Sequence, residues 1–161
     1  MATTSEAQAA GLYLSFELNE TEYGIPILSV REIIGVLPIT AVPEAPPAML
    51  GVVNLRGKVI PVVDLRQRFG LPSVDPTAAS CIIVVDLESG GSSRQCGVLV
   101  DRVADVVALS AVDIEPPPEM GEDRPARGLL GMGLIGSRLM VLLDLDEVLA
   151  HETVCEALAA A

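Results

Sequence analysis

An internal duplication constrains the fold of this chain more than any other feature of its sequence. The block YGIPILSVREII at residues 23–34 aligns with CGVLVDRVADVV at 96–107, with the glycine, the apolar positions and one acidic residue in register. A second block, GVVNLRGKVIPVVDLR at 51–66, aligns with residues 131–146 in the same order. Two blocks in one order favour a true repeat over chance, so we expect two similar lobes.

Short strands dominate the predicted secondary structure. Two Phe, two Tyr and no Trp are present, so the core rests on Val, Leu, Ile and Ala, and the branched residues among these favour strands. Apolar patterns predict strands at 12–18, 23–27, 52–55, 59–63, 80–87 and 95–100. Small barrels remove exposed sheet edges, so we expect each lobe to be a barrel of about five short strands.

A short helix is predicted after Ser29, ending at Gly35. Glu32 lies three residues after Ser29, which is the spacing of a capping box at a helix N-terminus. The apolar residues of this segment recur at helical spacing, namely Val30, Ile33, Ile34 and Leu37. A second short helix, at 65–69, is predicted to begin after Asp64.

The domain organisation follows from the repeat. Residues 12–150 are predicted to form one domain of two lobes, which take about residues 12–79 and 80–150 and leave open an exchange of elements between them. Residues 1–11 are expected to be flexible, and the alanine-rich segment 151–161 predicts a C-terminal helical tail. The proline-rich, acidic segment 113–127 lengthens the second copy, so we interpret it as a loop insertion.

The charge of the chain excludes several classes of partner. The formal net charge is -12 and Lys58 is the single lysine, which argues against nucleic acid and anionic membrane surfaces as partners. No cationic segment precedes an apolar stretch at the start, and no run approaches the roughly 18 apolar residues of a membrane span. We therefore expect a cytoplasmic protein.

The inventory of catalytic residues is thin. His151 is the single histidine and lies in the predicted tail, where a solvated or capping role is expected. Asp144 follows a predicted strand where an N-cap belongs, so capping is favoured over binding of a divalent cation with Asp146. Neither a disulfide framework nor a zinc site is indicated by the three cysteines, Cys81, Cys96 and Cys155. We expect a binding protein that is not an enzyme and has neither a cofactor nor a metal.

One cationic step, Arg56-Gly57-Lys58, joins two apolar runs and predicts a hairpin turn. Gly57 tolerates positive φ, which explains the turn but not the arginine. The repeat aligns Arg56 with Gly136, so the turn is duplicated and the arginine is not. Arg56 is therefore our leading candidate for a contact with a partner, and a solvated turn is the alternative.

The sequence GVVNLRGKVIPVVDLRQRFGL resembles the signature of the CheW family, the coupling proteins of bacterial chemotaxis. The resemblance continues through YGIPILSVREIIGV, CGVLVDRVADVV, DIEPPPE and LLDLDEVL, and covers about residues 13–150. It implies a mainly β fold of two five-stranded SH3-like barrels related by a pseudo-twofold axis, with short helices. It also implies a CheW-like domain over residues 12–150.

The resemblance further implies an adaptor that joins two partners, and family members are not enzymes. The partners would be the hairpin tips of chemoreceptors, the methyl-accepting chemotaxis proteins, and the regulatory domain of the histidine kinase CheA. The protein would be cytoplasmic and recruited to the receptor array at the inner membrane. Two alternatives stay open, namely the same adaptor chemistry in a pathway for surface motility or gene regulation, and a small-molecule sensor that uses the cleft between the lobes.

By resemblance, the receptor-binding residues are Val30, Glu32, Ile33, Val98 and Val103. The same resemblance implies a kinase or receptor interface at Arg56, Gly57 and Lys58. Core packing is the alternative for Val30 and Ile33, and helix capping is the alternative for Glu32. The chain departs from some family members at Ile34, where a basic residue is expected.

Overall fold

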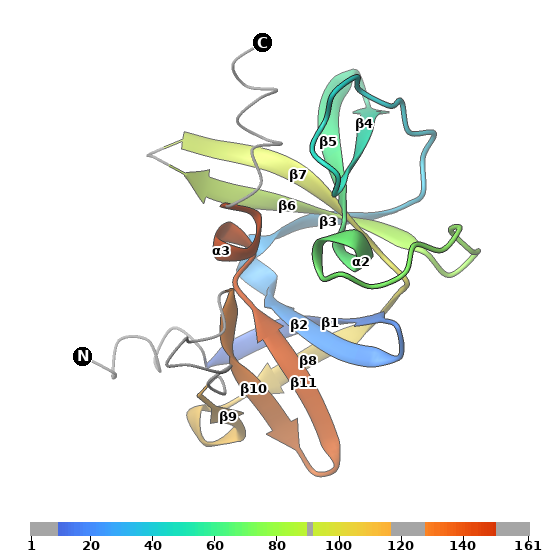
Figure 1. Ribbon diagram of the computed structural model, residues 1–161. Helices are drawn as coiled ribbons and strands as arrows, with labels where there is room; N and C mark the ends of the chain where they lie inside the picture. The colour runs from blue at the N-terminus through green and yellow to red at the C-terminus, as the bar shows by residue number, and fades with distance from the viewer. Residues whose placement is uncertain (1–9, 90–91, 117–127, 151–161) are drawn as a thin grey trace, which may run out of the picture.

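Eleven strands form two sheets in the computed structural model, which describes residues 10–89, 92–116 and 128–150 (Figure 1). The first sheet has the order β8-β1-β2-β11-β10-β9 and consists of β1 (Gly11–Leu18), β2 (Thr21–Pro26), β8 (Arg102–Leu109), β9 (Ile114–Glu115), β10 (Leu129–Ile135) and β11 (Arg138–Leu143). The second sheet has the order β3-β6-β7-β5-β4 and consists of β3 (Val30–Gly35), β4 (Met49–Leu55), β5 (Lys58–Asp64), β6 (Cys81–Ser89) and β7 (Ser92–Val100). The expected mainly β fold is confirmed, and closure of each sheet into a barrel stays a prediction.

The pairing of strands confirms the duplication. In the first sheet β2 runs parallel to β11, with Gly24 opposite Leu142. In the second sheet β7 runs parallel to β5, with Gly97 opposite Val62. The repeat aligns Gly24 with Gly97 and Val62 with Leu142. The same two aligned positions therefore face each other in both sheets.

Neither sheet follows one half of the sequence. The hairpin β1–β2 lies beside β8 and β11, whereas β3 to β7 make up the second sheet (Figure 1). The chain passes from the first sheet to the second through the 3-10 helix η1 (Ile27–Ser29) and returns at residue 101, between β7 and β8. Residues 79–80, where we placed the division between lobes, directly precede β6 of the second sheet.

The helix predicted between Ser29 and Gly35 is wrong, because this segment is strand β3. Its residues pair antiparallel with β6, with Ile33 opposite Ile83. Val30 already has extended backbone, with φ -87° and ψ 124°, so Ser29 caps no helix there. The branched residues of the segment fit a strand as well as an amphipathic helix, and the pairing with β6 decides between the two.

The two capping aspartates are confirmed. Asp64 precedes α2 (Leu65–Arg68) and accepts a hydrogen bond from the backbone N–H of Arg66 at 3.0 Å. Asp144 precedes α3 (Leu145–Ala150) and accepts one from the backbone N–H of Asp146 at 3.1 Å. A short 3-10 helix, η2 (Ala111–Asp113), follows β8. The predicted tail at 151–161, with His151 and Cys155, lies outside the described residues, as does most of the loop insertion.

Three groups of buried apolar side chains form the core. The largest takes residues from both sheets, among them Phe16, Ile25, Ile83, Val98 and Leu143, and includes Leu65 of α2 and Val148 of α3. A smaller group belongs to the second sheet and contains Ile60, Val62 and Ile82. A third belongs to the first sheet and contains Tyr13, Met140 and Leu142. Burial of apolar surface between the two sheets therefore holds them together.

Candidate functional site

An ion pair joins Glu32 of β3 to Arg56 of the turn between β4 and β5, two candidate residues from different sequence motifs. Nη2 of Arg56 donates a hydrogen bond to Oε1 of Glu32. Because β3 and β4 are the first and last strands of the second sheet, this contact brings the two edges of the sheet together. The side chain of Arg56 stays 68% exposed, so most of its five N–H donors face solvent.

The electrostatics of the pair favour the charged forms of both groups. The hydrogen bond from Arg56 holds the pKa of Glu32 below its ordinary value. The same carboxylate raises the pKa of Arg56. The surface therefore presents a fixed guanidinium next to a fixed carboxylate at neutral pH.

The turn that carries Arg56 has an uncommon backbone conformation. Arg56 has φ 53° and Gly57 has φ 86°, and Leu55 pairs with Lys58, which together define a two-residue turn with positive φ at both positions. The side-chain oxygen of Asn54 accepts a hydrogen bond from the backbone N–H of Gly57 at 2.8 Å. Glycine adopts positive φ freely and an arginine rarely does. A strained arginine in an exposed turn supports a role in contact with a partner.

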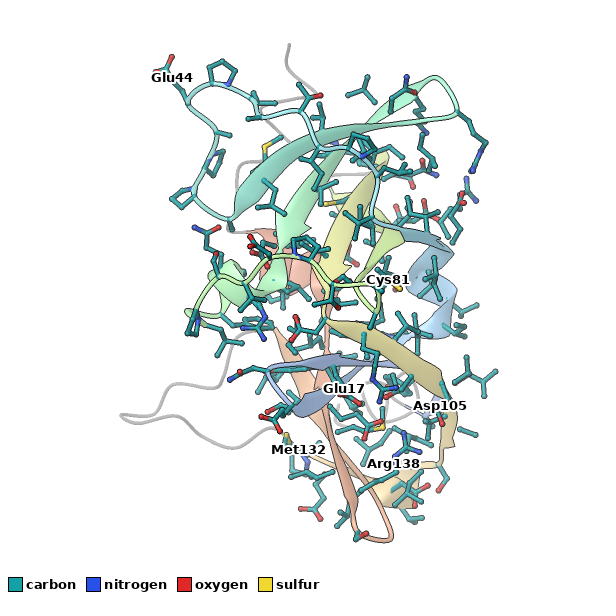
Figure 2. The ribbon with its side chains drawn as sticks, turned by 90° about the vertical axis from the view of Figure 1, so that its right-hand side faces the viewer. Glu17, Glu44, Cys81, Asp105, Met132 and Arg138 are labelled. Carbon is teal, nitrogen blue, oxygen red and sulfur yellow. The ribbon has the colours of Figure 1, made fainter. Side chains whose placement is uncertain are left out.

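The second copy of the hairpin corrects part of the argument from the repeat. Gly136 has φ 59°, so the turn itself is duplicated without its arginine. However, Arg138, which aligns with Lys58, donates a hydrogen bond of 3.0 Å to Asp105, which aligns with Glu32 (Figure 2). An acidic residue and an arginine thus meet in both sheets, and the arginine of the first sheet lies two positions further along the hairpin.

The pair in the first sheet is enclosed by more charge than the pair in the second. Arg138 also donates to Glu22 of β2, and the buried hydroxyl of Ser15 donates to the same carboxylate. The hydrogen bond from Arg138 lowers the pKa of Glu22, and the two carboxylates raise the pKa of Arg138. Sequence reasoning missed Glu22, although a polar residue at position 15 within a buried strand is a signal of such a network.

Exposed apolar side chains occur next to each pair in the sequence. Ile33 follows Glu32 and is 43% exposed, and Val59 of β5 is 65% exposed. Their aligned positions, Val106 and Leu139, are also exposed. Lys58 and Gly57 are exposed beside Arg56. Exposed apolar residues thus accompany the acidic residue and the arginine at aligned positions of both copies of the repeat.

The remaining predicted site residues lie in or against the core. Val98 is 1% exposed, within the cluster between the sheets, so it presents no surface to a partner. Val30 and Val103 are half-buried and pack against the same cluster. The structure therefore brings Glu32 and Arg56 together and leaves Val98 apart from them.

The described part of the chain offers little for small ligands. No group of three His, Cys, Asp or Glu side chains in these residues is arranged to bind a metal ion. An apolar groove of about 280 Å³ is lined by Ala10, Leu12, Tyr13, Pro26, Ile27 and Leu28. None of the helices at residues 10–89, 92–116 and 128–150 is long and apolar enough to cross a membrane.

Comparison with known proteins finds similarity over nearly the whole chain. Residues 12–153 match the family model described as CheW-like domain. The probable chemotaxis protein CheW of Rhizobium etli is 40% identical over 144 residues, which cover 89% of this chain and 90% of that protein. Protein FrzA of Myxococcus xanthus is 29% identical over 133 residues, covering 81% and 79%. The crystal structure of the scaffolding protein TtCheW from Thermoanaerobacter tengcongensis has a TM-score of 0.76 at 32% identity, covering 86% of this chain and 92% of that one.

Proposed function

This chain belongs to the CheW-like domain family, and from that premise we propose that it couples the cytoplasmic tips of chemoreceptors to the histidine kinase CheA in a signalling array. As a member of that family it is a scaffold protein of chemotaxis and not an enzyme. Under this proposal the chain binds its partner proteins and holds them in a fixed arrangement. The proposal places the chain in the cytoplasm, beside the inner membrane that carries the receptors.

The Glu32–Arg56 pair is the observation that carries this proposal. Glu32 lies on β3 and Arg56 in the turn between β4 and β5; one hydrogen bond fixes them, and both stay accessible. Ile33 and Val59, close to them in the sequence, are exposed as well. A guanidinium held in place before binding loses less side-chain freedom when a partner docks. Arginine is also among the residues that contribute most to protein interfaces. We assign the surface around Glu32 and Arg56 to contact with the receptor or the kinase. Val30 and Val103 pack against the core and are assigned to the support of that surface.

The proposal is tested by binding to each partner separately. The full chain is mixed with a soluble receptor hairpin fragment and, in a second arm, with the regulatory domain of the kinase, both taken from the genome that encodes this chain. We expect both to bind with dissociation constants of tens of micromolar or tighter, which calorimetry measures. Binding of neither partner at such concentrations would overturn the adaptor role.

A second candidate keeps the adaptor chemistry and changes the pathway. Protein FrzA of Myxococcus xanthus, to which this chain is similar, is not named a chemotaxis protein CheW, and this similarity supports the second candidate. Deletion of the gene separates the two, since loss of swimming chemotaxis supports the first and an intact swimming response with another defect supports the second. The small-molecule sensor has only the apolar groove in its favour, which lacks a convergent polar set.

A further inference from the structure

A single residue, Asp101, lies where the chain returns from the second sheet to the first. It follows β7, which ends at Val100, and precedes β8, which begins at Arg102. The other passage between the sheets takes the three residues of η1. A connection of one residue leaves the two sheets little slack, so the contacts of that residue bear directly on the angle between them.

The Asp101 carboxylate holds groups from both sheets. Arg66 of α2, which follows β5 of the second sheet, donates from Nε to Oδ1 at 2.8 Å and from Nη2 to Oδ2 at 2.7 Å. Asn19, in the turn between β1 and β2 of the first sheet, donates its backbone N–H to Oδ2 at 2.8 Å. The backbone N–H of Asp101 donates to the carbonyl oxygen of Glu17 at 3.1 Å.

Arg66 is itself fixed in a second direction. Its Nη1 donates to the carbonyl oxygen of Pro72 at 2.9 Å, and its side chain is 12% exposed. A bidentate arginine and carboxylate define one relative orientation, because the two planar groups must lie edge to edge. The pair is partly buried, so solvent screens it less than it screens a pair on the open surface. This geometry differs from that of the exposed pair of Arg102 with Glu17, one residue away.

We call the bidentate pair of Arg66 with Asp101 the clamp. The repeat shows that the fold does not need such a clamp at each passage between the sheets. Asp101 aligns with Leu28, which is 93% exposed, and Arg66 aligns with Asp146. Asp146 accepts a hydrogen bond from the backbone N–H of Glu88 and so links α3 to β6. One passage thus carries an ion pair between sheets and the other an exposed leucine.

We propose that Asp101 and Arg66 are positioning residues that set the angle between the two sheets, and through it the arrangement of the partner surface. This inference rests on the proposed function. The surface at Glu32 and Ile33 lies on β3 of the second sheet. Val30 of β3 and Val103 of β8, which we assign to the support of that surface, pack against one core cluster from the two sheets. Val103 is two residues from Asp101, so a shift at Asp101 moves β8 relative to β3. Neither Asp101 nor Arg66 touches the partner itself.

The test measures the angle between the sheets directly, in the full chain. Residual dipolar couplings of backbone amides are fitted separately for the first and the second sheet in the native protein, Asp101→Asn and Arg66→Lys. The control is Arg102→Gln, which breaks the exposed neighbouring pair and leaves the clamp. We expect one alignment tensor to fit both sheets in the native protein and the control, and two distinct tensors in the clamp variants.

Binding of the receptor fragment is measured on the same samples. If the binding arrangement falls to about a tenth of the population, affinity falls about tenfold in the clamp variants and is unchanged in Arg102→Gln. A single tensor in Asp101→Asn and Arg66→Lys overturns the inference whatever the affinity. If Asp101→Asn does not fold, Arg66→Lys, which keeps the charge and loses the bidentate geometry, decides the question. A native protein that binds neither partner overturns the proposed function instead, and the tensors still decide the role of the clamp.

Discussion

Replacing Arg56 by glycine should separate the stability of the fold from its function. The substitution Arg56→Gly places at the first turn the residue that occupies the aligned position 136 of the second turn. Both positions have left-handed backbone, with φ 53° at Arg56 and φ 59° at Gly136. Glycine has no Cβ to strain at that φ, whereas arginine does.

The magnitude follows from two opposing effects. Relief of left-handed strain raises the midpoint of thermal unfolding by a few degrees in a chain of this size. Loss of the pair with Glu32 lowers it little, because Arg56 is 68% exposed and its charge is screened by solvent. We expect a net rise of about 2 °C, together with about tenfold weaker binding of the receptor fragment or the kinase domain.

The matched control is Gly136→Arg, which introduces the strain of the first turn into the second. No atom lies within 4 Å of an added Cβ at this position, so a clash does not confound the result. Calorimetric scans should show a fall of about 2 °C with binding unchanged. A lower midpoint for Arg56→Gly refutes the assignment of strain to this turn. Unchanged binding of both partners returns Arg56 to the role of a solvated turn residue.

Two further predictions concern stability. Gly97→Ala should lower the free energy of unfolding in urea by about 2 kcal/mol, because the new Cβ lies 2.8 Å from a stiff methyl group of Ile82. Gly24→Ala should cost roughly 1 kcal/mol less, because its new Cβ lies 2.8 Å from the flexible end of the Met140 side chain. Equal costs would contradict this account. Asp101→Asn should cost about 2 kcal/mol at pH 7, since the hydrogen bonds from Arg66 lower the pKa of Asp101 below its ordinary 3.8. That difference is fully present above about pH 5 and shrinks as the pH falls through the lowered pKa, so the unfolding curves of the two proteins should lie closer together at pH 3 than at pH 7.

Local chemistry and the repeat were predictable from the sequence. Asp64 and Asp144 cap short helices because a carboxylate next to free backbone N–H groups needs no distant partner. The opposition of Gly24 to Leu142 repeats that of Gly97 to Val62, so aligned residues indicated equivalent places in two sheets. Such features depend on neighbours in the chain or on its internal symmetry.

The identity of β3 was not predictable in the same way. Its apolar residues satisfy helical spacing and strand preference equally, and only the distant partner strand β6 distinguishes them. The burial of Val98 could not be predicted for the same reason, because the residues next to a valine in a strand do not indicate which face of the strand is buried. The pair of Glu32 with Arg56 depends on the curvature of a whole sheet, which no pattern within either motif encodes.

The arrangement of the two sheets has a consequence for biosynthesis. The second sheet lies within one stretch, residues 30–100, and can pair all of its strands while β8 is still inside the ribosome. The hairpin β1–β2 is made earlier, yet Phe16 and Ile25 reach their final neighbours only after β8 and β11 emerge. Pairing over such separations is slow and leaves apolar surface open to aggregation. The order of the strands therefore allows the second sheet to pair while the apolar face of the hairpin β1–β2 is still uncovered, and that face is the surface that a chaperone would protect.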